Sequence, residues 1–251
     1  MYNEIVQAIK TTISENEEQI LMWKEPIVEV ISAENENLVT LKEMVSDEHL
    51  LPCDILPDAK SIVSYFVPFR ENIVESNIDG ELASKEWVSA YIKTNELLKK
   101  ISESIEALLQ KKRYKAGKAP AAHSYDKAKL ISSWSHRHIA YIAGIGTFGM
   151  NNMLITKNGC CGRFGSIVTN YEFGSYKQTG RAGEKCIEKS GGACGRCRKK
   201  CVVNAYEGGT FDRYKCYGQC RKNDEYHKTA GNATVCGKCL VDLPCSLREP
   251  V

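Results

Sequence analysis

The chain has 251 residues, of which 43% are hydrophobic and 26% charged, with a formal net charge of +3. A chain of this length can bury a substantial core. Its apolar runs are shorter than the roughly 20 residues that a membrane-spanning helix needs. The opening residues, MYNEIVQAIKTTISENEEQI, are polar and amphipathic and lack the apolar core of a signal peptide. We therefore expect a cytoplasmic protein without a membrane partner.

Helical and strand patterns alternate along the first part of the chain. An amphipathic helix is expected over residues 1–20, and a strand within residues 26–41. The segment LPDAKSIVSYFVPF, residues 56–69, predicts a buried strand because its apolar residues follow one another without alternation. Residues 81–112 predict a long helix whose apolar stripe includes Trp87 and Ile101.

The pattern continues beyond this helix. A second helix is expected to begin at Asp126, whose side chain can cap its first turn, and to end at Gly144. The segment MLITKNGCCGRFGSIVTN, residues 153–170, predicts two strands joined by a glycine-rich turn. Such interleaving is typical of a layered α/β or α+β fold. We predict an α+β layered domain over residues 1–180 and a cysteine-rich domain over residues 181–251.

Nine of the twelve cysteines lie in the last 66 residues. The first group consists of Cys186, Cys194, Cys197 and Cys201, and the second of Cys216, Cys220, Cys236, Cys239 and Cys245. A thiolate is a soft, anionic ligand, and a cuboidal iron-sulfur cluster needs four of them converging from a short stretch of chain. The spacing therefore predicts ligands for two 4Fe-4S clusters and a protein that transfers single electrons.

Two-cluster ferredoxins suggest how these cysteines divide. In them, each cluster takes three ligands from one run of cysteines and its fourth from the end of the other run. Applied to this chain, that pattern assigns Cys186, Cys194, Cys197 and Cys245 to one cluster, and Cys201, Cys216, Cys236 and Cys239 to the other. Cys220 is then spare. Val202 replaces the proline that usually follows the fourth cysteine, but the tail is still expected to be a ferredoxin-like module.

Structural zinc and disulfides stay open as alternative roles for the cysteines. Zinc could be held by four thiolates from the pairs Cys194–Cys197 and Cys236–Cys239, although the remaining cysteines of the tail would then have no ligand role. A disulfide framework would suit an oxidising compartment, which the start of the chain does not indicate. The odd number of cysteines in the tail also disfavours disulfides.

The cysteine-rich tail is also basic. Residues 186–251 carry twelve Lys or Arg against seven Asp or Glu, whereas the rest of the chain has a small excess of acidic residues. A basic surface with tyrosines is one signature of nucleic-acid binding. Two 4Fe-4S clusters, each with a charge of roughly −2, would nearly cancel this excess. We therefore do not expect a nucleic-acid partner.

Residues 143–149 read AGIGTFG, with Gly144, Gly146 and Gly149 in GxGxxG spacing. A dinucleotide site requires a strand before the glycines and a helix after them. Here a predicted helix leads into the glycines and a predicted strand follows, so nicotinamide binding is not expected. Glycines in such a loop either serve turns with positive φ or let a flat cofactor approach the backbone closely.

The order of these segments resembles a known family. LPDAKSIVSYFVPF, then HRHIAYIAGIGTFGMNNMLIT, then the cysteine runs ending in CGKCLVDLPC follow one another as in epoxyqueuosine reductases and reductive dehalogenases. The resemblance covers roughly residues 50–245. It implies a nitroreductase-like domain that binds the corrinoid cobalamin, with two 4Fe-4S clusters supplying electrons. This sequence ends before the helical-repeat region with which epoxyqueuosine reductases hold transfer RNA, so it resembles a short member.

The resemblance also implies site residues. Corrinoid contacts are expected from His136, Arg137, His138, Gly144, Gly146, Gly149, Asn151 and Asn152. The two histidines are two apart on a predicted helix, so they cannot share one metal, and an ordinary hydrogen-bonding role stays open for each. The proton donor would be Asp126, as in epoxyqueuosine reductases, or Tyr125, as in reductive dehalogenases, while a capping role for Asp126 is equally open. Cys160 and Cys161 either fill a turn or present a thiol to cobalt.

Three functions remain compatible with these patterns. The chain is a corrinoid-dependent reductase of a small molecule or other organic substrate, a cobalamin-processing protein that reduces the corrinoid or removes its upper ligand, or an electron carrier without corrinoid. In each case an external low-potential donor of the ferredoxin or flavodoxin type is the expected electron source. In the first two, the electrons pass through the clusters to cobalt.

Overall fold

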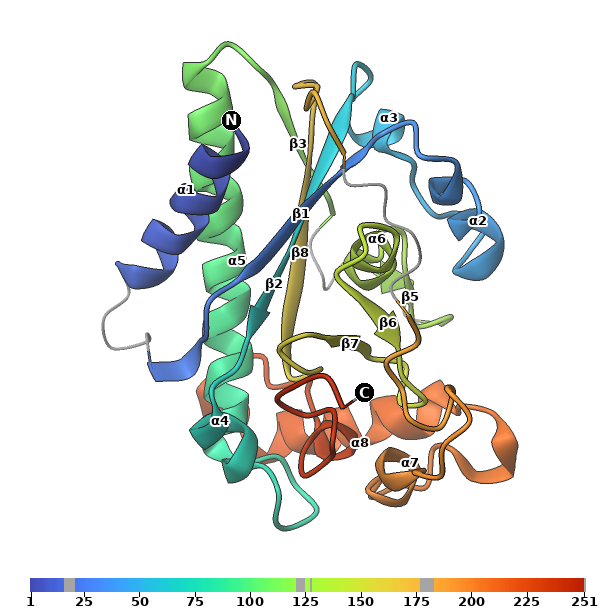
Figure 1. The fold of residues 1–251 in the computed structure, drawn as a ribbon. Helices are drawn as coiled ribbons and strands as arrows, with labels where there is room; N and C mark the ends of the chain where they lie inside the picture. Colours follow the sequence, from blue (N-terminus) through green and yellow to red (C-terminus); the bar gives the residue numbers. More distant parts are fainter. Residues whose placement is uncertain (16–20, 121–124, 127, 177–182, 251) are drawn as a thin grey trace.

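A four-stranded antiparallel sheet forms the centre of the computed structural model, which describes residues 1–15, 21–120, 125, 126, 128–176 and 183–250 (Figure 1). The strand order is β1 (Ile27–Ser32), β2 (Ser61–Pro68), β8 (Gly162–Thr169) and β3 (Ala116–Lys118). The strands expected within residues 26–41 and 56–69 are thus confirmed. Every residue of β2 is buried, which explains why its apolar residues do not alternate with polar ones.

One face of the sheet is covered by α1 (Tyr2–Ser14) and the long helix α5 (Lys85–Lys111) (Figure 1). Val63 and Tyr65 of β2 share a core with these helices, whereas Ile62 and Phe66 belong to the core on the opposite face. The helix expected over residues 81–112 is confirmed. Its first turn is capped by Ser84, whose side chain accepts a hydrogen bond from the Trp87 N–H. Of the helix expected over residues 1–20, residues 16–20 lie outside the described part.

The other face carries α6 (His136–Ile142), with η2 (Glu36–Leu38), α2 (Leu41–Met44) and α3 (Pro52–Ile55) beside it (Figure 1). Ile139 and Ala140 of α6 are fully buried there. Two small antiparallel pairs flank α6 in the sequence: β4 (Tyr125–Asp126) with β5 (Ile131–Ser132), and β6 (Gly146–Phe148) with β7 (Leu154–Thr156). Among the described residues, no helix is long and apolar enough to cross a membrane.

The predicted helix start at Asp126 is wrong. The Asp126 carboxylate accepts hydrogen bonds from the backbone N–H groups of Ala128 and Lys129, so it closes a turn between β4 and β5. Leu130 in that turn has a φ of +53°, which a helix does not allow. Asp126 therefore does use its side chain as a cap, but of a hairpin turn.

The two strands predicted within residues 153–170 exist, but they pair with different neighbours. β7 pairs with β6, and β8 enters the central sheet between β2 and β3. The turn between them contains Gly159, whose backbone bridges back to Thr156. These strands therefore link the glycine loop to the centre of the sheet instead of forming an independent hairpin.

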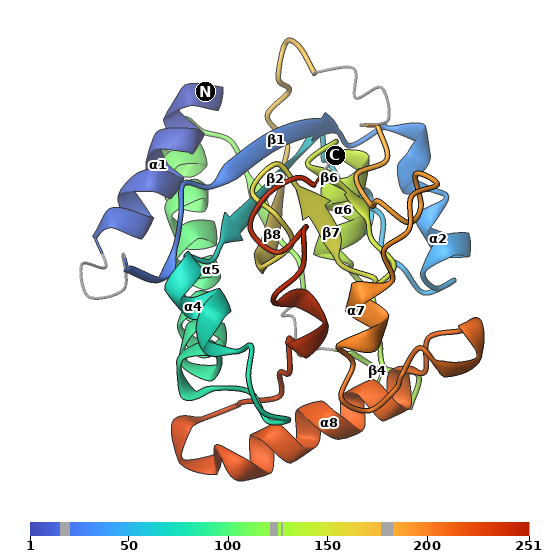
Figure 2. The ribbon, with the colours of Figure 1, turned by 60° about the horizontal axis from the view of Figure 1, so that its bottom comes forward.

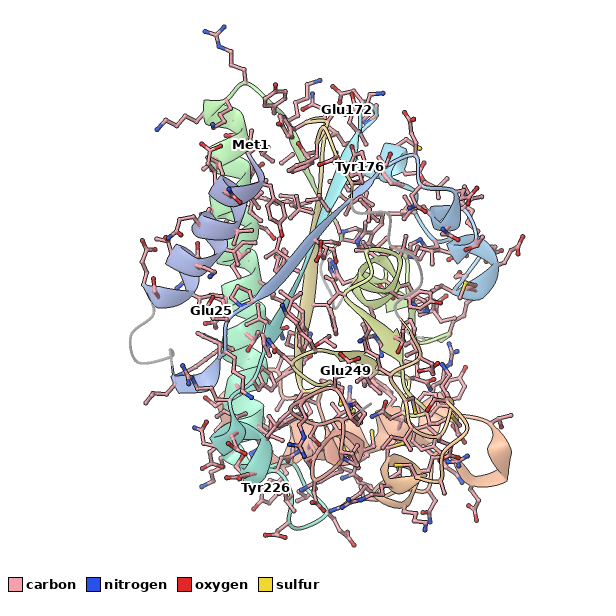
Figure 3. All side chains as sticks on the ribbon, in the orientation of Figure 1. Met1, Glu25, Glu172, Tyr176, Tyr226 and Glu249 are labelled. Atoms are coloured by element: carbon pink, nitrogen blue, oxygen red, sulfur yellow. The ribbon has the colours of Figure 1, made fainter. Side chains whose placement is uncertain are left out.

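The cysteine-rich segment lies across one end of the sheet and of α5 (Figure 2). Its described elements are helical: α7 (Arg196–Lys199), η3 (Glu207–Gly209), α8 (Arg213–Tyr226), η4 (Lys228–Ala230) and η5 (Lys238–Leu240). Sulfur atoms gather around α7, α8 and the neighbouring loops (Figure 3). The short helix α4 (Glu71–Ser76) leads into the loop of the layered part that this segment contacts.

Helix α8 is held to the start of α5 by buried polar side chains. Gln219 Nε2 donates to the Glu81 carbonyl, Asn223 Oδ1 accepts from the Ala83 N–H, and His227 Nε2 contacts the Ala83 carbonyl oxygen at 2.8 Å. These three residues are spaced four apart and so share one helix face. Apolar periodicity could not reveal this buried face because its contacts are hydrogen bonds.

Candidate functional site

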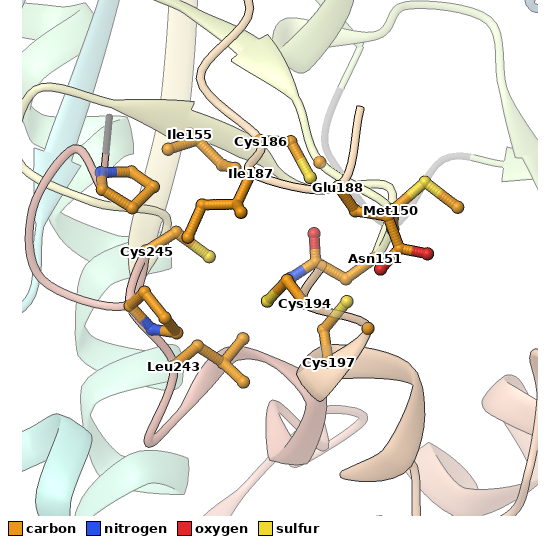
Figure 4. Close-up of a pocket in the computed structure, with 14 residues that line it drawn as sticks. Met150, Asn151, Ile155, Cys186, Ile187, Glu188, Cys194, Cys197, Leu243 and Cys245 are labelled. Atoms are coloured by element: carbon orange, nitrogen blue, oxygen red, sulfur yellow. The ribbon is translucent and has the colours of Figure 1, made fainter. Parts of the chain in front are cut away.

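Four cysteines line one cavity at the end of the sheet. Cys186, Cys194, Cys197 and Cys245 direct their side chains toward this common space (Figure 4), and we call them the first thiol group. They come from a loop before α7, from α7 and its approach, and from the end of the chain. The apolar side chains of Ile155, Ile187 and Leu243 complete the wall.

The remaining five cysteines of the tail form a second thiol group: Cys201, Cys216, Cys220, Cys236 and Cys239. Cys216 and Cys220 lie one turn apart on α8 and hydrogen-bond each other. Cys201, Cys216 and Cys236 are close enough to Cys239 for their charges to raise the pKa of its thiol, after the larger effect of burial. Tyr206 also hydrogen-bonds Cys239.

The structure therefore brings the four cysteines of the first predicted set together at one cavity, and places the four of the second set in a group that also contains Cys220. It separates the pair Cys194–Cys197 from the pair Cys236–Cys239, which the zinc alternative requires to meet. Within the described ranges, no three His, Cys, Asp or Glu side chains are spaced as ligands of one metal ion. A cuboidal cluster holds its four thiolates farther apart than one ion does, so the two groups suit clusters better than zinc. Their ligand roles stay a prediction.

Burial and neighbouring thiols raise the pKa values of several of these cysteines. Burial and the neighbouring Cys245 raise the pKa of Cys197 to about 11. Burial likewise raises the pKa of Cys236. Metal binding requires thiolates, so a metal centre held by these cysteines would displace their protons. Hydrogen bonding from Cys220 lowers the pKa of Cys216 to about 7, which marks Cys216 as the thiolate of that pair.

The turn between Cys236 and Cys239 is fixed by residues that the sequence patterns did not identify. Lys238 is 3% exposed and donates from Nζ to the carbonyl oxygens of Asn77 (2.9 Å) and Asp79 (2.7 Å). Asn77 Nδ2 donates to the Cys236 carbonyl at 3.0 Å. These partners are about 160 residues apart in sequence, so spacing within the tail carries no signal for them.

The glycine loop contacts both thiol groups. Gly149 and Asn151 line the cavity of the first group, and Asn151 Nδ2 donates to the Cys239 carbonyl of the second at 3.0 Å. Gly146 lies so close to β7 that a Cβ atom would overlap the Ile155 carbonyl group. Gly144 follows the last turn of α6, and its N–H donates to the Tyr141 carbonyl. The loop thus helps to position the cysteines of both thiol groups. Its corrinoid contacts stay a prediction.

The three predicted residues of α6 have protein partners. His136 Nδ1 lies 2.8 Å from Ser166 Oγ, which also accepts a hydrogen bond from Trp134 Nε1. His138 Nδ1 lies 2.7 Å from Ser135 Oγ. Burial lowers the pKa of each histidine to about 4. Both imidazoles are therefore neutral near pH 7.

Arg137 connects α6 to the second thiol group. Its guanidinium donates to the Asn152 carbonyl at 2.7 Å. Burial and the nearby cationic Arg163 lower the pKa of Arg137, whereas Tyr206 and Cys216 raise it. Within the described residues neither arginine has a carboxylate partner. Arg137 near Cys216 is a counter-charge of the kind that an anionic group at this site would need, and Arg163 lies close behind it.

The predicted proton donors lie on the β4–β5 hairpin. Hydrogen bonds from the backbone N–H groups of Lys129 and Ala128 lower the pKa of Asp126, which favours the carboxylate over the acid. The hairpin touches the start of α8, because Tyr214 Oη donates to the Ala128 carbonyl at 2.9 Å. The backbone of Tyr125 belongs to β4. In this arrangement Asp126 is a partly exposed turn residue and a poor general acid.

Cys160 and Cys161 are fully buried beside the end of the chain. The Cys160 N–H donates to the Cys245 carbonyl at 2.9 Å, and Cys161 Sγ lies 3.2 Å from the Leu240 carbonyl oxygen. The pair therefore supports the backbone that presents Cys245. This position favours the turn role over the presentation of a thiol to cobalt.

Comparison with known proteins identifies structures that share the fold of this chain. No protein-family profile and no curated sequence matches the chain. Solved structures of epoxyqueuosine reductases do match. The enzyme from Streptococcus thermophilus aligns with a TM-score of 0.56 and 19% identity, over 96% of this chain and 68% of that one. An epoxyqueuosine reductase with a tRNA-Tyr epoxyqueuosine-modified stem loop aligns with a TM-score of 0.56 and 18% identity, over 96% of this chain and 66% of that one.

A third structure, of the Bacillus subtilis enzyme, has its catalytic aspartate loop swung out of the active site. It aligns with a TM-score of 0.52 and 18% identity, over 96% of this chain and 66% of that one. The chain thus spans about two thirds of the length of these structures. At this identity the likeness establishes that the chain shares their mixed helix and sheet fold, as the resemblance in sequence predicted.

The two α6 histidines give a testable pH dependence. Their pKa values are about 4 in the folded chain against 6.5 when unperturbed, so the unfolded chain binds more protons between these values. The free energy of unfolding should be fully retained above pH 6.5 and should decrease as the pH falls toward 4. Denaturant unfolding at fixed pH values measures this decrease, and His136→Gln should reduce it while His138 continues to contribute. If the decrease in unfolding free energy were unchanged in His136→Gln, the assignment of His136 as a buried, neutral imidazole would be contradicted.

Proposed function

We propose that this chain, which has the fold of epoxyqueuosine reductases, is an oxidoreductase that holds one 4Fe-4S cluster in each thiol group. The observation that supports this most strongly is the meeting of distant cysteines in two groups, one of four thiols and one of five. Cys186, Cys194, Cys197 and Cys245 would hold the first cluster, and Cys201, Cys216, Cys236 and Cys239 the second. Hydrogen-bonded turns present these thiols, as rigid cluster binding requires.

The fold likeness also supports cobalamin as a further cofactor. When bound, the clusters and cobalamin would supply one-electron transfer and a strongly reducing cobalt centre, with an external ferredoxin or flavodoxin as donor. The residues of α6 suit a neighbouring corrinoid: His136 and His138 are neutral donors or acceptors, and Arg137 is a cation near Cys216. Asn151 would couple the glycine loop to the second cluster through the Cys239 carbonyl.

The stem-loop complex of the related structure makes epoxyqueuosine in transfer RNA the first candidate to test, although the charge of the tail did not predict a nucleic-acid partner. Reduction of such a carbon centre consumes protons and needs a positioned acid. Asp126 could act only if the β4–β5 hairpin moved, as the aspartate loop does in the Bacillus subtilis structure.

A cobalamin-processing role is the second candidate. The lowered pKa of Asp126 favours it, because reducing the corrinoid or removing its upper ligand does not require a protein acid. In that role the corrinoid would be the substrate itself, and the same thiol groups would supply the electrons. The two functions differ in their substrate, which is epoxyqueuosine in one and the corrinoid in the other, but both would use the same cluster sites.

The ligand assignment predicts how single cysteine variants behave. Cys197→Ser should lose the first cluster and Cys239→Ser the second, each leaving about half of the iron, because each removes one of four thiolates. Cys220→Ser is the matched control on α8 and should keep both clusters. Iron analysis with EPR of the reduced protein resolves these outcomes. Loss of a cluster from Cys220→Ser but not from Cys216→Ser would reverse the assignment on that helix.

Anaerobic reconstitution with hydroxocobalamin separates the candidate functions. We expect the protein to bind the corrinoid and to reduce it through the clusters. If no corrinoid binds, the function that remains is that of an electron carrier. Asp126→Asn keeps an oxygen that can accept the two turn hydrogen bonds, so the fold should be unchanged. If Asp126 is the acid, the variant should bind and reduce the corrinoid but lose turnover of epoxyqueuosine in transfer RNA by about 10²-fold or more. Unchanged turnover would remove Asp126 from the reaction.

A further inference from the structure

One of the three tryptophans carries a buried donor without an acceptor. Trp23, Trp87 and Trp134 are all 3% exposed or less. Trp23 Nε1 donates to Thr94 Oγ1 at 2.8 Å, and Trp134 Nε1 donates to Ser166 Oγ at 3.0 Å. Within the described part of the chain, Trp87 Nε1 has no hydrogen-bond partner. An indole N–H can only donate, and a buried donor normally has an acceptor.

The unpartnered N–H lies at the turn between two cysteines of the second thiol group. Trp87 packs edge-on against Phe69 in the core, with ring centroids 5.4 Å apart. The side of the indole that carries Nε1 faces Gly237, where an added Cβ would come within 2.6 Å of Nε1. Gly237 has a φ of +78° and stands between Cys236 and Lys238. Only a glycine leaves room for the indole at this turn.

The turn and the indole are both fixed in place. Asn77 holds the Cys236 carbonyl, and Lys238 is anchored through two carbonyl oxygens of the loop before α5. Trp87 itself belongs to the first turn of α5, whose cap is Ser84. The donor therefore cannot turn toward solvent without disrupting the helix start. What it lacks is an acceptor on the side of the cysteines.

We propose that the Trp87 indole N–H donates a hydrogen bond to a sulfur atom of the second 4Fe-4S cluster, either a cluster sulfide or a Cys236 or Cys239 thiolate. This inference rests on the proposed function, because the acceptor is supplied by the bound cluster. Trp87 thus contributes to the reduction potential of this cluster through that hydrogen bond. A donor stabilises the more negatively charged reduced state, so it raises the potential.

The test is an EPR-monitored redox titration of the full chain with both clusters. Trp87→Phe keeps an aromatic ring in the core but removes the donor, so the potential of the second cluster should shift to a more negative value. The potential of the first cluster should not change. Trp23→Phe is the matched control, because it also removes a buried indole donor, one that already has a protein acceptor. Equal potentials in wild type and Trp87→Phe would overturn the proposal.

A measurement on the wild-type protein covers the case in which Trp87→Phe fails to assemble the second cluster. Protein labelled with ¹⁵N in the indole ring should show hyperfine coupling of one indole nitrogen and one exchangeable proton to the reduced second cluster. Absence of this coupling from a wild-type protein that contains both clusters would overturn the inference alone. Absence of the second cluster from the wild type would instead refute the proposed function.

Discussion

The whole candidate site depends on buried hydrogen bonds that join the cysteine-rich segment to the loop between α4 and α5. Asn77 is at the centre of this contact, because its carbonyl accepts from Lys238, its Nδ2 donates to the Cys236 carbonyl, and its Oδ1 accepts from the Ser84 N–H. Asn77 is fully buried. Losing such a residue would leave several buried groups unpaired, each at a cost of about 1–3 kcal/mol. One side chain thus couples a cysteine turn to the cap of α5.

This coupling ties the fold to cofactor binding. Burial and the neighbouring cysteines raise the pKa of Cys239, which favours its neutral thiol when no metal is bound. A cluster bound by these thiols would add its binding free energy to the folded state. The buried Lys238 and the nearby Arg137 would then face an anionic group instead of other uncharged protein atoms. The polar contacts preorganise the turns at which the proposed clusters would bind.

The layered part of the fold was largely predictable because its signals are local. Continuous burial of β2 and the apolar stripe of α5 both follow from sequence patterns that a sheet covered by helices produces. The start of α6 was mispredicted because an aspartate can cap a hairpin turn as well as a helix. The positive φ of Leu130, which shows that the segment is a turn, is not visible in the sequence.

The cysteine grouping was predictable from spacing, but its supports were not. The pattern around Trp87 indicates only a core residue, and Asn77 and Lys238 carry no local signature of their long-range contacts. Buried polar faces such as that of α8 look solvent-exposed in sequence, since their partners lie some 140 residues away. Gly149 and Asn151 were found by sequence, but the structure places them at the thiol groups.

The proposed occupancy of the two thiol groups by two 4Fe-4S clusters can be measured on anaerobically prepared protein by iron and acid-labile sulfide analysis combined with Mössbauer spectroscopy. We expect close to eight iron and eight sulfide per chain, all in 4Fe-4S clusters, since two cuboidal sites would be filled. About one zinc per chain without sulfide would show that the cysteines hold a structural zinc site instead.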